Sequence, residues 1–301
     1  DDVDISVKLS DDLTLKFPLI ASPMVGVVDR KFAKLLSDLG GLAVIHRFYD
    51  THEEKIEDIR ENLSPEDNFG ISIKIGQEGF DAYLDFNPNI FIIDTANGYT
   101  EKLWSYVEKV SNYIYDHNYK TLLMAGNVVT KEGCDILYGA GCDIIRVGIG
   151  GGSPCSTRNQ TGISIPNISA IINCNNDGNR NYKIAIDGGI KNSGDFVKAI
   201  VAGADFGISG KLFAQSFEAP NKGVLYGMAS RTHMNKIEAK IKSVEGIDTV
   251  IKKQYSLEQF VSEFGYGIKS AGTYLNARSL DEIYSYGEFI QVTDSAIKKG
   301  I

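Results

Sequence analysis

The chain has 301 residues, of which 43% are hydrophobic and 23% are charged, as is usual for a globular protein with a sizeable core. Lysine and arginine total 31 against 39 aspartate and glutamate residues, giving a formal net charge of -8. This acidic balance argues against a broad nucleic-acid-binding surface and against binding to an acidic membrane. No run approaches the roughly 20 apolar residues of a membrane span, and the N-terminus is unlike a signal peptide, so we expect a cytoplasmic protein.

Eight short apolar or β-branched runs alternate with segments of helical periodicity. The runs are 17–23, 42–47, 69–75, 90–96, 121–127, 143–148, 183–189 and 204–210. Strands of this kind, each followed by a helix, indicate a parallel sheet whose faces are covered. Eight such units predict an α/β fold of the (β/α)8 type, a TIM barrel. A doubly wound open sheet is the alternative.

Capping residues mark where several helices begin. Asp29 stands before a stretch with apolar residues at i, i+3, i+4 and i+7. Thr51 with Glu54, and Ser256 with Gln259, have the spacing of a capping box ahead of apolar helical stripes. The pattern therefore predicts helices that begin just after residues 29, 51 and 256.

Two insertions interrupt the regular spacing of the strands. The sixth and seventh strands begin at residues 143 and 183, farther apart than the other neighbours. A second long segment, residues 212–255, separates the last strand from the C-terminal helix, and we expect it to form a flap over the barrel mouth. Residues 1–301 are therefore expected to form a single barrel domain that includes this flap.

Glycines cluster after three consecutive strands, at the end of a barrel where reactive groups lie. Gly148 opens a run that includes Gly150 and Gly152; Gly188 and Gly189 follow the seventh strand; Gly210 and Lys211 follow the eighth. Glycine lets backbone amides approach an anion closely, so these loops are candidates for a phosphate site. The alternative is that each glycine only permits a tight turn.

Cys155 differs from the other cysteines because it lies in an irregular loop at a strand end. A thiolate there could be reached from solvent, and Arg158 nearby could lower its pKa, so Cys155 is a candidate nucleophile; an unreactive loop thiol is the alternative. Thr157 could activate a water or a leaving group, or be an ordinary loop hydroxyl. The spacing excludes a CxxC zinc cluster. The remaining cysteines fall in helix or strand patterns and are expected in the core: Cys134, Cys142 and Cys174.

Three polar residues at strand ends complete the candidate site. Asp187, just before the Gly188-Gly189 pair, could accept hydrogen bonds from ribose hydroxyls. Asp94 and Asn97 end the fourth strand and supply a carboxylate and an amide, which would suit an amide-bearing ring such as nicotinamide. For all three, capping of the next turn or helix is the alternative.

The run VGIGGGSPCSTR at 147–158, with Thr161-Gly162 and Pro166, resembles the catalytic loop shared by the IMP dehydrogenase and GMP reductase family. The resemblance covers nearly the whole chain. Three stretches are more similar to the reductase branch: DTANGY at 94–99, MAGNVVT at 124–130 and FIQVT at 289–293. The dehydrogenase inserts a pair of CBS regulatory modules after the second helix, and residues 62–68 leave no room for them.

The resemblance implies a covalent reaction: Cys155 attacks C2 of the purine of GMP, ammonia leaves to give a thioimidate, and NADPH delivers hydride to C2 to yield IMP. Thr157 would assist the amine step. The implied substrate-binding residues are Ser153, Gly188, Gly189, Gly210 and Lys211 for the phosphate, Asp187 for the ribose, and Tyr226, Gly227 and Met228 of the flap for the base. The implied cofactor-binding residues are Asp94, Asn97, Gly148 and Gly150. Carbonyls of Gly150, Gly152 and Cys155 would hold a monovalent cation, expected to be potassium, and the assembly would be a homotetramer.

Three positions depart from the reductase pattern. Arg231 stands where the flap acid is expected, Val25 replaces an aspartate, and Pro154 replaces a branched apolar residue. Since arginine cannot act as an acid at neutral pH, the proton would have to come from another group. The alternatives are an IMP dehydrogenase that converts IMP to XMP with NAD, a catalytically impaired purine-nucleotide-binding homologue and, without the resemblance, a phosphate-handling barrel lyase or isomerase.

Overall fold

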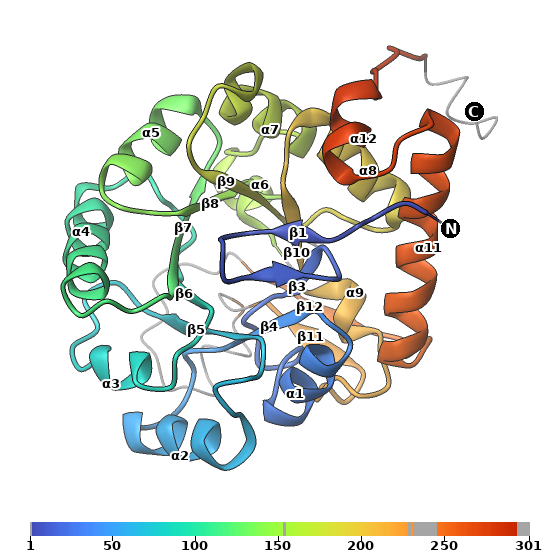
Figure 1. The fold of residues 1–301 in the computed structure, drawn as a ribbon. Coiled ribbons are helices and arrows are strands. Elements are labelled where there is room, and N and C mark those ends of the chain that lie inside the picture. Colours follow the sequence, from blue (N-terminus) through green and yellow to red (C-terminus); the bar gives the residue numbers. More distant parts are fainter. Residues whose placement is uncertain (1, 153–154, 228–229, 231–245, 294–301) are drawn as a thin grey trace.

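The computed structural model, which describes residues 2–152, 155–227, 230 and 246–293, contains a closed barrel of eight parallel strands (Figure 1). The strands are β3 (Leu19–Ala21), β4 (Leu42–Ile45), β5 (Phe69–Ile73), β6 (Ile90–Ile93), β7 (Leu122–Val128), β8 (Ile144–Val147), β9 (Lys183–Asp187) and β10 (Phe206–Ser209). The barrel closes where Ile208 of β10 pairs with Ile20 of β3. This closure confirms the predicted TIM barrel and excludes the open sheet.

Helices form an outer ring around the strands (Figure 1). They are α1 (Arg30–Asp38), α2 (His52–Asn62), α3 (Asp81–Leu84), α4 (Glu101–Asp116), α5 (Lys131–Gly139), α7 (Asn167–Asn175), α8 (Ser193–Ala202), α11 (Leu257–Leu275) and α12 (Leu280–Tyr286). Two short helices, α6 (Thr157–Thr161) and α9 (Lys211–Ala214), follow β8 and β10. The apolar stripes of the helices and the inward side chains of the strands form one continuous core. No helix in the described part of the chain is both long and apolar enough to cross a membrane.

The predicted caps form as expected. The side chain of Asp29 accepts a hydrogen bond from the amide of Phe32, and Thr51 and Ser256 accept from the amides three residues later. The capping box at Thr51 differs from the usual pattern in one detail. The carboxylate of Glu54 accepts a hydrogen bond from the amide of Asp50, and not from the amide of Thr51 itself. Local sequence therefore fixes where these helices begin.

Two hairpins lie outside the barrel, and the strand pattern did not predict either. β1 (Val7–Lys8) pairs with β2 (Thr14–Leu15), and Leu13 of their connection lines a hollow with Asn89 and Thr121, which precede β6 and β7. This hairpin thus lies at the amino ends of the strands. β11 (Val224–Tyr226) pairs with β12 (Asp248–Val250) inside the segment expected to form a flap.

Lys55 is a buried charge on the inner face of α2. Its side chain is 2% exposed, and its ammonium donates to the carbonyl of Ser72 at 2.7 Å and lies 4.6 Å from the ring centroid of Tyr83. Burial, with a smaller effect of the nearby Arg47 charge, lowers the pKa of Lys55 to about 7. The folded protein therefore holds this proton more weakly than the unfolded chain does.

We predict that Lys55 makes stability rise with pH. Below pH 7 the lysine is protonated in both states, whereas between about 7 and 10.5 only the unfolded chain keeps the proton. The free energy of unfolding should then gain up to about 1.4 kcal/mol per pH unit from this group. Urea denaturation from pH 7 to 10 should show the rise in the parent chain and in the exposed control Lys102→Met, but not in Lys55→Met. Parallel pH profiles for all three would contradict the assignment.

Candidate active site

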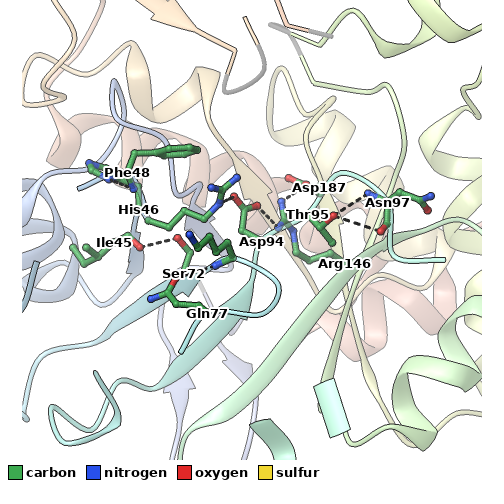
Figure 2. Close-up of polar contacts among 12 residues, drawn as sticks. Ile45, His46, Phe48, Ser72, Gln77, Asp94, Thr95, Asn97, Arg146 and Asp187 are labelled. Atoms are coloured by element: carbon green, nitrogen blue, oxygen red, sulfur yellow. Dashed lines mark hydrogen bonds and ion pairs between the residues drawn. The ribbon is translucent and has the colours of Figure 1, made fainter. Parts of the chain in front are cut away.

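Arg146 of β8 joins two carboxylates that the sequence placed in the site (Figure 2). The side chain is 7% exposed; its Nη1 lies 3.0 Å from Oδ1 of Asp94, which follows β6, and its Nη2 lies 2.7 Å from Oδ2 of Asp187, which ends β9. Burial alone would lower the pKa of Arg146, but the two carboxylates outweigh burial and raise it above the ordinary value. Arg146 is therefore a permanent cation held between two anions.

Further polar groups extend this bridge across the carboxyl end of the barrel. Arg47, just after β4, places Nε 3.2 Å from Oδ2 of Asp94. Asn127 of β7 donates its amide to Oδ2 of Asp187 and to the carbonyl of Gly148, both at 2.8 Å. Within the described residues, Nε of Arg146 and Oδ1 of Asn127 are buried without a partner. A donor and an acceptor thus remain for a ligand at the floor of the mouth.

None of the three strand-end residues caps a helix, and of the three only Asn97 caps its own turn. Thr100 caps α4 and Asn192 caps α8. Asn97 is exposed and turns its Oδ1 to the amide of Tyr99 at 2.9 Å, apart from the bridge. The structure thus brings Asp94 and Asp187 together and leaves Asn97 at the rim.

Cys155 and Thr157 lie together at the start of α6. The half-buried thiol of Cys155 donates to Oγ1 of Thr157 at 3.2 Å, and the Cys155 amide donates to the carbonyl of Gly152 at 3.0 Å. Cys134, Cys142 and Cys174 are buried, as predicted. Cys155 also forms a β-bridge with Gly246, two residues before β12. The hairpin segment therefore contacts the candidate nucleophile.

The loops after β8 and β9 touch each other through glycine. Gly188 and Gly189 have φ values of +73° and +74°, a left-handed conformation that favours glycine. A Cβ on Gly188 would lie 3.1 Å from the Cα of Gly152, so the backbones approach as closely as they can. Asn167, the first residue of α7, donates to the carbonyl of Gly188 at 2.9 Å and ties the two loops together.

The other candidate residues lie around the same end of the barrel. Gly210 and Lys211 follow β10 at the start of α9; Tyr226 ends β11, and Gly227 follows it. The amide of Gly227 donates to the carbonyl of Ile247 at 3.1 Å. Four further residues named from the sequence lie outside the described residues: Ser153, Pro154, Met228 and Arg231.

The main-chain carbonyl oxygens of the loop after β8 could bind a cation. Gly150, with φ of +81°, and Gly152 lie on one turn of this loop, and the Gly152 carbonyl already accepts one hydrogen bond. A carbonyl has two lone pairs, so the donor set fits a weakly bound monovalent cation. Among the described residues, no three His, Cys, Asp or Glu side chains gather to hold a metal ion.

A model of the IMP dehydrogenase / GMP reductase domain matches residues 1–301. The chain belongs to the IMP dehydrogenase / GMP reductase family. A GMP reductase of Aliivibrio fischeri strain ES114 is 35% identical over 315 residues, covering 96% of this chain and 89% of the relative. GMP reductases of Buchnera aphidicola subsp. Schizaphis graminum and Ascaris suum are 32% and 31% identical over 309 and 296 residues, covering 96% and 92% of this chain and 87% and 82% of the relatives.

Arg146 was not predicted from the sequence of this family member, and neither were the roles of Arg47 and Asn127 as partners of the two carboxylates. One signal was available, because Arg146 is a lone charge in the buried strand Ile144–Val147. A charge is rarely buried without a partner, so carboxylates on neighbouring strand ends could have been sought. Which carboxylates it meets depends on barrel closure and could not be inferred from spacing.

We predict that Arg146→Met lowers the free energy of unfolding by about 3 kcal/mol, because two partly buried carboxylates lose their shared cation. Arg146→Lys should lose less, since an ammonium keeps the charge but cannot span both partners. Urea denaturation at neutral pH measures both changes. Lys131→Met, which removes an exposed pair with Asp135, serves as the control and should leave stability nearly unchanged. If Arg146→Met lowers the free energy of unfolding as little as the control does, the assignment of Arg146 as the shared cation of Asp94 and Asp187 is wrong.

Proposed function

We propose that the chain catalyses the reductive deamination of GMP to IMP and ammonia with NADPH. The observation that carries the proposal is the Cys155–Thr157 pair, with Sγ and Oγ1 3.2 Å apart beside the glycine loops after β8 and β9. The reductase relatives, the reductase-like stretches of sequence and the paired carboxylates Asp94 and Asp187 support it.

In the first half-reaction, the Cys155 sulfur forms a bond to C2 of the purine, and the bond from C2 to the exocyclic amino nitrogen breaks. The thiol proton passes to the departing amine through Thr157 Oγ1, which already accepts it in a hydrogen bond, so that ammonia and a thioimidate result. This route uses no flap acid and therefore accommodates Arg231. Asp187, fixed by Arg146 and Asn127, holds the ribose.

In the second half-reaction, C2 would gain a hydride and the C–S bond would break with its electron pair leaving on sulfur; the sulfur then takes up a proton from solvent, which restores the Cys155 thiol and releases IMP. NADPH supplies this hydride when bound. The residues that would hold NADPH are Asp94, Asn97, Gly148 and Gly150. Two buried atoms at the floor of the mouth have no hydrogen-bond partner among the described residues: Arg146 Nε and Asn127 Oδ1. They fit a polar substituent of the ring at this position.

Other residues around the reacting atoms bind the rest of the nucleotide. The phosphate is bound by Ser153, Gly188, Gly189, Gly210 and Lys211, and the base is bound by Tyr226, Gly227 and Met228. Carbonyls of Gly150, Gly152 and Cys155 hold potassium. Residues 212–255 act as a flap on a single-domain barrel, for which the bridge between Cys155 and Gly246 is the support. The family resemblance supports a cytoplasmic homotetramer.

We predict that GMP causes loss of NADPH absorbance with release of one ammonia per NADPH. Cys155→Ala should abolish both, because no other thiol reaches the mouth among the described residues. Cys142→Ala, which removes a buried thiol outside the site, is the matched control and should keep activity.

Two outcomes would contradict the proposal. Formation of NADH and a xanthosine nucleotide from IMP and NAD would identify the dehydrogenase instead. Tight binding of GMP or IMP without hydride transfer in either assay would identify a catalytically impaired homologue.

A further inference from the structure

Lys253 is a cation whose hydrogen bonds within the described residues all go to main-chain carbonyls, with the charge of Glu218 nearby. Its ammonium donates to the carbonyls of Ala214, Ser216 and Ala219, with Nζ–O distances of 3.2, 2.7 and 2.8 Å. An ammonium has three N–H donors, so these contacts use all of them. Among the described residues, no carboxylate lies within 4.0 Å of this ammonium. The group is held by oxygen dipoles, as a small monovalent cation would be.

The carbonyls belong to the turn that leaves α9. Ala214 is the last residue of α9, where the helix dipole favours a positive charge, and its carbonyl also accepts a hydrogen bond from the side-chain amide of Asn221 at 2.8 Å. Helix α9 begins at Lys211, one of the residues assigned to the phosphate. Lys253 therefore fixes the far end of the short element that carries that residue.

Lys253 also lies three residues beyond β12, so the same contacts hold both ends of the flap segment together. Other hydrogen bonds also join these ends: the Gln254 amide donates to Gln215 O at 2.9 Å, the Phe217 amide to Tyr255 O at 2.9 Å, Tyr255 Oη to Leu212 O at 2.8 Å, and the Ile251 amide to Gly223 O at 2.8 Å. Lys253 is the one charged side chain that these described contacts contain. It is placed to control how firmly the base of the hairpin is closed.

We propose that Lys253 is a positioning residue: its ammonium fills a carbonyl site for a monovalent cation and so holds the β11–β12 hairpin against Cys155. The link is the bridge between Gly246, beside β12, and Cys155. The effect of Lys253 on turnover rests on the proposed function. The clamp, by which we mean the contacts of Lys253 with the carbonyls of Ala214, Ser216 and Ala219, can be tested without any enzyme activity.

The first test measures alkylation of Cys155 by iodoacetamide, with hydrogen exchange of the hairpin amides in parallel. Lys253→Met keeps the side-chain length without the charge, and Lys252→Met removes an exposed neighbouring lysine as the control. We expect Lys253→Met to speed both processes by about tenfold, since charge-assisted hydrogen bonds are lost, with exchange in β5 to β8 unchanged. Rates equal to those of Lys252→Met, or faster exchange throughout the barrel, would overturn the proposal.

A second test replaces the lost ammonium chemically. Lys253→Ala leaves room for n-propylammonium, which restores the missing carbons and the three N–H donors. We expect n-propylammonium chloride to restore slow alkylation of Cys155, whereas tetramethylammonium chloride, which has no N–H donor, should not. Equal effects of both salts would show that the carbonyls do not bind an ammonium group, and the proposal would fail. If the parent chain does not consume NADPH with GMP, the proposed function fails while both tests of Lys253 remain decisive.

Discussion

The arrangement of the site depends on one buried cation. Arg146 is nearly inaccessible to solvent and contacts a carboxylate on either side, from the end of β6 and the end of β9. A buried charge is costly unless it is paired, so the guanidinium fixes how far apart Asp94 and Asp187 lie. Because Arg146 is planar and bidentate, it also fixes their orientation. The mouth is thereby divided into a half that contains Asp94 and a half that contains Asp187.

The loops around this bridge follow from close backbone packing. Gly188 and Gly189 adopt left-handed conformations that bring the loop after β9 against the loop after β8, and Asn167 joins them. Cys155 then lies at the start of α6, with its thiol on Thr157 and its backbone against the hairpin segment. The covalent reaction proposed for this site would use the fixed position of the Cys155 thiol beside Thr157.

Much of the fold could be predicted because it depends on local patterns. The eight strands and the caps at Asp29, Thr51 and Ser256 follow from periodicity and side-chain chemistry. The candidate site residues were found at strand ends, but their partners were not. Arg146 contacts Asp94 and Asp187, which are 52 and 41 positions away, so these ion pairs form only after the barrel closes. Lys253 contacts residues up to 39 positions away at the other end of the flap segment. The two hairpins were missed because their strands have only two or three residues.

A double-mutant cycle on Asp94→Asn and Asp187→Asn, measured as free energy of unfolding, tests the central role of Arg146 most directly. Each single variant leaves the guanidinium one carboxylate, whereas the double variant leaves it buried without any. If Arg146 is shared, the double variant should lose at least about 1 kcal/mol more than the two single losses combined. Additive losses would show that the carboxylates do not share the cation, and would contradict the central role of Arg146.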